Sequence, residues 1–332
     1  MAQVILTEAS GTLKELFGEI QAPLASIVMD MANATEAKSI ARKIFTERKS
    51  TNSIEAYGSL TAVDSFAPVG ENGAYPTGGF ESGYFQEMRN QTWKGSFAIS
   101  REAHDDVKAI DLTKVPSSFF SDYERKFERF FAALMGNAIQ GNTSFDVNGF
   151  TFSTKSADGV AQFSKNHKMK VKGTNQSNVF AGAFGKETLN KLITMMQNVK
   201  DDNNNTMSLI PDTLIIPNLP DLKDAAFAVL GSNKDPNTAN NAFNALFATL
   251  NIIVWPTLND YIGTEAPFIL MDSGYNKTAD GAVFQNRVPL EIRDSLGDND
   301  EYLWKGYSRF TGGFVDFRAM FVGGVSTGSV FA

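Results

Sequence analysis

The sequence contains no cysteine, which excludes disulfide bonds, thiolate metal ligands and cysteine nucleophiles. It has only two histidines, His104 and His167, and neither belongs to a ligand-spaced pair, so no zinc site is predicted. No apolar run approaches the roughly 18 to 20 residues of a membrane span, and residues 1–10 lack the features of a signal peptide. We therefore expect a protein made in the cytoplasm, without a membrane partner, that is stabilised by packing or assembly.

Positively charged residues are the minority among the charged ones. The 30 lysines and arginines stand against 37 aspartates and glutamates, which gives a net charge of -7 and a pI near 5.0. Binding to phosphates requires clustered Lys and Arg, so we expect any contact with nucleic acid to be local and independent of base sequence. At 332 residues the chain exceeds the roughly 250 to 300 residues of a single core, which predicts two packed subdomains.

Motifs for catalysis and cofactor binding are absent or lack the surroundings that they need. Residues 324–328 match the G-x-S-x-G pattern of a nucleophile elbow, but neither a helix nor a histidine follows, so we expect a turn there. The acidic clusters at residues 201–205 and 298–301 lack the spacing of a calcium loop and are predicted to be solvated turns. His104 is more typical of a surface or an interface than of a catalytic base. We expect no catalytic residue, no metal and no cofactor.

The most unusual segment is residues 58–97. It holds seven glycines, seven aromatic residues and only six charged ones, which is too apolar for a disordered linker and too rich in glycine for a core. Its ends have strand patterns at residues 54–63 and 85–99, and its tip, residues 68–83, contains turn-forming Asn-Gly and Gly-Gly pairs. We interpret it as a long two-stranded loop that becomes ordered against a neighbouring molecule. Its predicted anchor residues are Phe66, Tyr75, Phe80, Tyr84 and Phe85.

A basic segment precedes this loop. Residues 13–31 have apolar residues at helical spacing and are interpreted as an amino-terminal arm, and residues 38–49 are predicted to form a short basic amphipathic helix. Charge runs of this kind usually form a solvated helix face, which is the first interpretation here. The second interpretation is a surface that faces nucleic acid, and its residues would be Lys38, Arg42, Lys43, Arg48 and Lys49.

The rest of the chain predicts an α+β protein. Residues 117–138 form the strongest helix, with a phenylalanine stripe on one side and charged residues, Glu124 among them, on the other. Further helices are predicted at residues 186–199, 220–230 and 239–250. Buried strands are predicted at residues 213–217 and 251–255, and the alternating residues 315–321 predict a strand paired with residues 302–309.

Five segments carry a resemblance to a known family when they are taken in order. Residues 93–102 (WKGSFAISRE) resemble a strand that returns from an extended loop, and the helix at residues 117–138 takes the place of a spine helix. Residues 214–222 (LIIPNLPDL), the paired strands at 250–256 and 267–272, and residues 304–322 follow. Together these segments resemble the major capsid proteins of tailed bacteriophages, which have the HK97-like fold.

The resemblance implies an α+β, HK97-like subunit that self-assembles as hexamers and pentamers into an icosahedral head shell around double-stranded DNA, and hence a virion protein and not an enzyme. The implied parts are an amino-terminal arm at 1–56, an extended loop at 57–97, a peripheral subdomain at 98–210 and 301–332, and an axial subdomain at 211–300. Implied partners are a portal, a separate scaffolding protein, a decoration protein and the packaged DNA, which is contacted nonspecifically.

Two departures from the family pattern refine these expectations. Some relatives crosslink subunits through a lysine on the extended loop, but Lys94, at the base, is the only lysine between residues 58 and 97, so we predict a noncovalent shell. Only about fifty residues precede the loop, which leads us to expect a scaffolding protein encoded separately. Two other interpretations stay open: an encapsulin-like compartment that encloses protein cargo, and a soluble enzyme whose site has no recognisable motif.

Overall fold

The computed structural model describes most of the chain as two compact α+β units. The first unit comprises residues 1–55, 88–130 and 284–312, and the second comprises residues 56–87, 131–283 and 313–332. The described residues are 5–7, 38–62, 66–77, 80–100, 114–170, 175–232, 244–296 and 301–325. The predicted arm helix at 13–31 and His104 lie outside them. The predicted peripheral and axial subdomain boundaries stay predictions.

The first unit is built on a five-stranded sheet. Its strands are ordered β1 (Ile5–Thr7), β12 (Ala282–Leu296), β13 (Tyr302–Phe314) and β5 (Gln91–Ile99), and β2 (Thr46–Lys49) also pairs with β12. The pairing of β13 with β5 is antiparallel and the pairing of β1 with β12 is parallel. Because side chains alternate along a strand, the sheet presents one face to the helix that covers it and the other face away from that helix.

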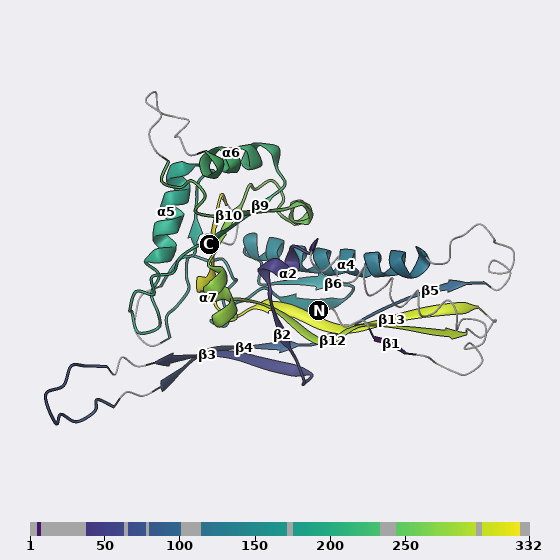
Figure 1. Ribbon diagram of the computed structural model, residues 1–332, viewed down its shortest axis with the longest axis horizontal. Helices are drawn as coiled ribbons and strands as arrows, with labels where there is room; N and C mark the ends of the chain where they lie inside the picture. Colours follow the sequence, from purple (N-terminus) through teal and green to yellow (C-terminus); the bar gives the residue numbers. More distant parts are fainter. Residues whose placement is uncertain are drawn as a thin grey trace. The chain divides into compact units, whose positions relative to one another are not determined.

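The long helix α4 (Lys114–Ile139) covers one face of this sheet (Figure 1). It includes the whole of the predicted 117–138 helix, and the predicted stripe is buried at six positions: Phe120, Phe127, Phe130, Phe131, Leu134 and Met135. The helix ends two residues before Gly141, whose φ of 75° suits the left-handed position that commonly follows a helix. One expectation was wrong, because Glu124 is 5% exposed and does not face water.

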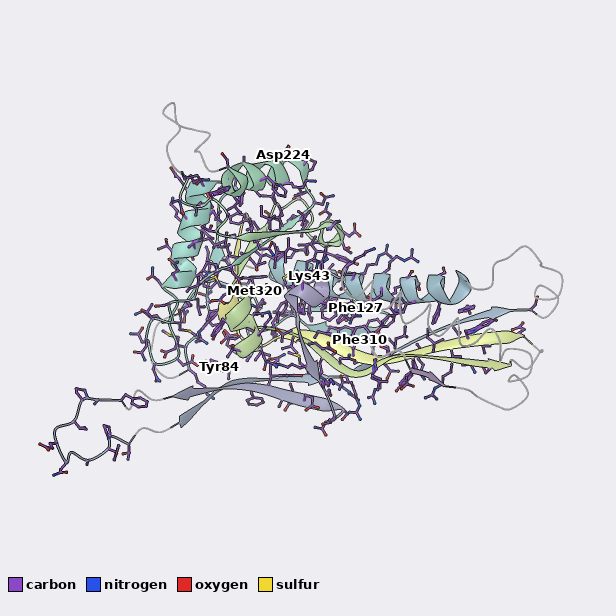
Figure 2. The ribbon with its side chains drawn as sticks, viewed as in Figure 1. Lys43, Tyr84, Phe127, Asp224, Phe310 and Met320 are labelled. Carbon is purple, nitrogen blue, oxygen red and sulfur yellow. The ribbon has the colours of Figure 1, made fainter. Side chains whose placement is uncertain are left out.

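Phe310 of β13 stands at the centre of the aromatic core of the first unit. Its ring stacks on Trp93 with centroids 4.9 Å apart, and Phe127 lies 5.3 Å away at a tilted angle (Figure 2). The Trp93 indole nitrogen donates a hydrogen bond of 3.1 Å to the Phe310 carbonyl. Farther along the strand, Gly306 lets the Phe119 ring approach, since a Cβ there would lie 2.6 Å from it. The sheet and α4 are therefore joined by interlocking aromatic rings.

The second unit contains another five-stranded sheet. Its strands are ordered β10 (Asn251–Trp255), β9 (Thr213–Pro217), β11 (Phe268–Met271), β14 (Met320–Gly323) and β8 (Val179–Phe180). β9, β11 and β14 are buried along their whole length, as expected for central strands covered on both faces. The structure confirms the predicted strands at 213–217 and 251–255.

Helices complete the core of the second unit. They are α5 (Lys186–Gln197), α6 (Pro220–Gly231), α7 (Ser273–Thr278) and the 3₁₀ turn η1 (Pro256–Tyr261). α5 and α6 bury Leu189, Leu192, Leu222 and Ala226 in one cluster with the sheet. Pro220 occupies the first turn of α6, and the Asp272 carboxylate caps α7 by accepting a hydrogen bond from the Tyr275 amide. The first two predicted helices, at 186–199 and 220–230, are confirmed.

Two hairpins extend from the second unit. The short one joins β6 (Ser144–Val147) and β7 (Phe150–Ser153) through Asn148 and Gly149, whose φ values of 50° and 81° fit a two-residue hairpin turn. The long one joins β3 (Ile54–Ala62) to β4 (Phe80–Arg89) and is the predicted extended loop.

Three predicted elements were wrong in detail. The single return strand at 85–99 is two strands, β4 and β5, separated at Asn90. Residues 244–250 of the predicted 239–250 helix form turns. Residues 315–321 are interrupted by the 3₁₀ turn η2 (Phe317–Ala319), and β14 beyond it pairs with β11 and β8, whereas the strand at 302–314 pairs with β5.

Replacing Phe310 with alanine is expected to destabilise the chain by about 3–5 kcal/mol, because the cavity would open among five packed rings. Phe150→Ala is the matched control, since Phe150 is 56% exposed and a surface change of this kind costs only about 0.5 kcal/mol. Urea denaturation of both variants measures the difference. Similar destabilisation of the two variants would contradict the central position of Phe310.

Candidate assembly site

The extended loop consists of a two-stranded ribbon, β3 and β4, and an irregular tip. We call residues 66–77 the loop tip; the turn at Glu71 and Asn72 lies at its centre, and the Gly73 amide donates a 2.8 Å hydrogen bond to the Gly70 carbonyl. Asn72 has a φ of 60°, a left-handed conformation that asparagine tolerates well. The predicted turn at the Asn-Gly pair is confirmed.

The loop tip exposes large apolar side chains. Phe66 is 99% exposed and Tyr75 is 92% exposed, while Val69 between them is 53% exposed. On the ribbon, Phe85 is 65% exposed and faces Gly58 of the opposite strand. Exposed large apolar side chains that gather in one segment are a feature of interaction surfaces. Phe80 begins β4, and its side chain lies outside the described residues.

Tyr84 differs from the other aromatic residues of the loop because it lies against its own chain. It is half-buried, and the Lys170 ammonium stands 5.6 Å from its ring while donating a 2.7 Å hydrogen bond to the Gly83 carbonyl. Burial, followed by the negative charges of Asp158 and Asp202, raises the pKa of Tyr84. Lys170 and Tyr84 thus attach the ribbon to the body of the second unit.

A polar turn fixes the start of β3. The Glu55 carboxylate accepts hydrogen bonds from the Thr51 and Asn52 amides at 2.8 and 2.9 Å. These backbone donors, Asn52 first, lower the pKa of Glu55 to about 2. The buried Asn90, where β4 ends, donates to the Ser50 hydroxyl at 2.7 Å and to the Asn52 carbonyl at 2.8 Å. The two ends of the loop are therefore held together by side-chain hydrogen bonds.

The basic segment, residues 38–49, is not the continuous helix that was predicted. Helix α2 (Ala41–Ile44) is a single turn, and the chain then continues as strand β2, which contains Arg48 and Lys49. Arg42 is drawn inward: its guanidinium lies 2.8 Å from the Glu124 carboxylate and 4.3 Å from the Phe127 ring centroid. Lys38, Lys43 and Lys49 are exposed and Arg48 is half-buried.

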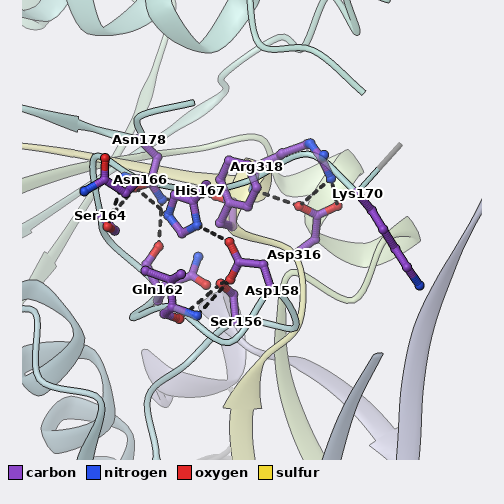
Figure 3. Close-up of polar contacts among 12 residues, drawn as sticks. Ser156, Asp158, Gln162, Ser164, Asn166, His167, Lys170, Asn178, Asp316 and Arg318 are labelled. Atoms are coloured by element: carbon purple, nitrogen blue, oxygen red, sulfur yellow. Dashed lines mark hydrogen bonds and ion pairs between the residues drawn. The ribbon is translucent and has the colours of Figure 1, made fainter. Parts of the chain in front are cut away.

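The second unit buries a polar cluster that the sequence did not reveal (Figure 3). His167 is fully buried, its Nδ1 lies 2.6 Å from the Asp158 carboxylate, and its ring stacks on Phe317 at 3.8 Å. Burial alone would raise the pKa of Asp158, but the hydrogen bond and charge of His167 outweigh it and hold the pKa below its ordinary value. Asn178 accepts from the Ser164 amide at 2.9 Å and donates to three carbonyls, which closes the cluster.

Arg318 forms the second half of this cluster. Its guanidinium contacts the Asp202 carboxylate at 2.7 Å and the Asp316 carboxylate at 3.3 Å, and its Nε donates to the Lys200 carbonyl at 3.0 Å. Burial alone would lower the pKa of Arg318. The negative charges of Asp316 and then Asp202 outweigh this effect and raise the pKa. This explains why the predicted alternation of residues 315–321 failed, since Asp316 and Arg318 are buried with their partners.

The described residues offer little to a cofactor or a metal. Within the described ranges, no group of three or more His, Asp or Glu side chains is placed to hold a metal ion. Asp201 in the 201–205 turn accepts hydrogen bonds from the Asn203 and Asn205 amides, so its carboxylate oxygen serves the turn itself. Among all the residues that the structure describes, no helix is both long enough and apolar enough to cross a membrane.

Solved structures similar to this chain include several phage capsids. The capsid of cyanophage P-SCSP1u matches with a TM-score of 0.53 and 11% identity over 88% of this chain and 89% of that chain. The capsid of Ralstonia phage GP4 matches with a TM-score of 0.51 and 12% identity over 86% and 87%. The mature capsid of bacteriophage PhiM1 matches with a TM-score of 0.51 and 9% identity over 86% of each chain. These likenesses show the fold, which is the HK97-like capsid fold.

The sequence profile of the phage capsid protein family matches residues 86–323, well over half of the chain. The chain belongs to the phage capsid protein family. No curated protein matches it. This capsid protein is a major component of the virion head shell and is a structural subunit, not an enzyme.

Replacing Arg318 with methionine is expected to destabilise the capsid protein by about 3–5 kcal/mol, because Asp202 and Asp316 would remain as buried carboxylates without a counter-charge. Arg293→Met is the matched control: Arg293 pairs with Glu291 at 2.8 Å but is 57% exposed, and such pairs contribute about 0–1 kcal/mol. Urea denaturation of the unassembled chain measures both. Equal destabilisation by the two substitutions would contradict the expectation that the buried ion pairs of Arg318 matter more for stability than the exposed Arg293–Glu291 pair.

Proposed function

We propose that neighbouring copies of this capsid protein hold one another through noncovalent contacts of the extended loop. The observation that carries the proposal is the exposure of Phe66 and Tyr75, at 99% and 92%, on the loop tip. Closed shells are built from repeated complementary contacts between identical subunits. An apolar arm that is exposed in the single subunit and covered in the assembly fits that requirement.

The expected strength of the contact follows from the aromatic residues. Fully burying a phenylalanine side chain contributes about 1.5–3 kcal/mol, so Phe66 and Tyr75 together can supply several kcal/mol for each subunit. Aromatic anchors of this kind are typical centres of interface energy. Phe85, which is exposed on the ribbon, would extend the same contact, whereas Tyr84 is engaged with Lys170 and would hold the loop to its own subunit.

The lysine distribution supports a contact without a covalent bond. Lys94, the only lysine between residues 58 and 97, lies on β5 in the first unit, outside the ribbon and the loop tip. A covalent crosslink that starts from a lysine side chain therefore has no lysine to use in the ribbon or the loop tip.

Replacing the loop tip, residues 66–77, by a Gly-Ser linker of equal length is expected to leave a folded subunit that cannot close a stable shell. The linker removes Phe66, Val69 and Tyr75 but keeps β3, β4 and the Lys170 contact, so the fold should persist. Circular dichroism and thermal unfolding check the fold, and electron microscopy of assembly reactions checks the shell. A Gly-Ser linker in place of residues 146–151, at the short hairpin, is the control; normal shells from the loop-tip variant would refute the proposal.

We also propose that the basic segment faces the packaged double-stranded DNA through Lys38, Lys43, Arg48 and Lys49. Support comes from the exposure of its three lysines in a chain of net charge -7, where only a local basic surface could contact phosphates. Arg42 would take no direct part, because its guanidinium is paired with Glu124.

Hexamers and pentamers, a separate scaffolding protein, a portal and a decoration protein complete the proposed assembly. The division into peripheral and axial subdomains belongs to it as well.

Neutralising the segment with Lys38→Gln, Lys43→Gln and Lys49→Gln is expected to weaken DNA retention while empty shells still form. Removing one lysine–phosphate interaction should reduce the slope of log K against log salt by about 0.9. DNA release from filled shells at increasing salt measures the effect. Lys168→Gln, Lys191→Gln and Lys277→Gln provide a control of equal charge in the second unit. Failure of the first variant to form any shell would assign the segment to assembly instead.

A further inference from the structure

His167 is fully buried in the second unit, and each of its ring nitrogens faces an oxygen atom (Figure 3). Nδ1 lies 2.6 Å from Oδ2 of Asp158, and Nε2 lies 3.2 Å from Oδ1 of Asn178. A neutral imidazole has one N–H donor and one unprotonated acceptor nitrogen, whereas the imidazolium has two donors. The protonation state of His167 therefore follows from what these two oxygen atoms can accept.

The neighbours of Asn178 fix the orientation of its side-chain amide. Its nitrogen donates to three backbone carbonyls, at 2.7, 3.3 and 3.2 Å, and its Oδ1 accepts from the Ser164 amide at 2.9 Å. Exchanging the nitrogen and the oxygen would place an oxygen against three carbonyl oxygens and an NH₂ group against a backbone N–H. Oδ1 is therefore an acceptor, and Nε2 of His167 must donate to it.

The neighbours of Asp158 are also donors. Its Oδ1 accepts from the Ser156 hydroxyl at 2.6 Å and from the Val160 amide at 3.1 Å. Burial raises the pKa of Asp158, but the hydrogen bond and charge of His167 and then these two bonds bring the pKa below its ordinary value. An ionised carboxylate only accepts, so Nδ1 of His167 must donate as well. Two donors on one ring describe the imidazolium cation.

The surroundings offer no other free cation to balance Asp158. Around the pair lie further charged or titratable side chains: Tyr84, Lys170, Asp202, Tyr275, Asp316 and Arg318. The guanidinium of Arg318 is already shared by Asp202 and Asp316, and the Lys170 ammonium is exposed. Loss of one proton from His167 would therefore leave the Asp158 carboxylate buried without a counter-charge.

The pair lies next to the attachment of the extended loop. Lys170 follows His167 by three residues, and its ammonium donates the 2.7 Å hydrogen bond to the Gly83 carbonyl. The charge of Asp158 also acts on the ribbon itself, since burial first and this charge second raise the pKa of Tyr84. The residues that hold the ribbon are therefore close enough to respond to the charge of the pair.

We propose that the His167–Asp158 pair is a proton-dependent lock on the extended loop. While His167 carries both protons, the charges of the pair cancel, the segment that ends at Lys170 keeps its position, and the ribbon stays attached. Loss of a proton as the pH rises strands the Asp158 carboxylate, so the segment opens and the ribbon is released. The inference rests on the proposed function of the loop and adds a means by which its attachment is regulated.

Nitrogen NMR tests the protonation directly. The chain has two histidines, so His104→Gln leaves His167 as the only imidazole. In the unassembled subunit labelled with ¹⁵N-histidine, both ring nitrogens should give the signals of protonated imidazolium nitrogens at neutral pH. A spectrum with one unprotonated ring nitrogen would overturn the inference.

Proteolysis tests the lock. Chymotrypsin cleaves after aromatic residues, and cleavage after Tyr75, which is 92% exposed, serves as the internal reference for cleavage after the half-buried Tyr84. His167→Gln strands Asp158 and should raise the Tyr84 to Tyr75 ratio of cleavage rates by about tenfold or more. Adding Asp158→Asn makes the pair neutral and should restore the native ratio. Mass spectrometry follows both cleavages.

The pH dependence separates a lock that depends on a proton from a contact that is only structural. In the native chain the ratio should rise with pH below about pH 10, where tyrosine itself ionises, because the lock is present while the proton is held. In the neutral variant, His167→Gln with Asp158→Asn, it should stay level. A native ratio that is independent of pH, or an equal rise in both chains, would overturn the lock.

A failure of this inference is distinguishable from a failure of the proposed function. The NMR and proteolysis measurements use the unassembled subunit, so they can contradict the lock while loop-mediated assembly stands. The loop-tip linker variant changes neither His167 nor Tyr84 and tests only the contact between copies.

Discussion

The packing of the α4 phenylalanine stripe onto Phe310 is the interaction on which the first unit depends. Phe310 touches rings from β5, α4 and β12, so one side chain joins three elements that are far apart in sequence. Phenylalanine suits this role because it fills a core without needing a polar partner, and the chain has 27 of them. The position of this core fixes α4 against one face of the sheet.

The second unit differs from the first because its interior contains charged side chains. Arg318 lies in its interior in hydrogen-bonded ion pairs with Asp202 and Asp316, and His167 lies there hydrogen-bonded to Asp158. Buried ion pairs contribute little net stability but penalise any arrangement that separates them, which favours a single geometry. Lys170, close to this cluster in sequence, holds the Gly83 carbonyl of the loop. A rigid body and an attached loop are what a subunit needs if it is to place its arm on a neighbour reproducibly.

Local pattern was sufficient to predict the elements whose side chains follow one period. The strands at 213–217 and 251–255, the helix α4 and the Asn72 turn were all predictable in this way. Prediction failed where a distant partner decides the local structure. Asn90 divides the return strand because it bonds to Ser50, 40 residues away, and Arg42 is turned inward by Glu124, 82 residues away. Arg318 is buried for the same reason, by Asp202.

The aromatic residues of the extended loop could be predicted from the sequence because they depart from a general rule. The rule is that a single subunit buries its large apolar side chains. Phe66 and Tyr75 remain almost fully exposed, at a cost in apolar hydration that a monomer would have no reason to carry. Burial of Phe66 and Tyr75 against a neighbouring copy, as proposed for the extended loop, would remove that cost.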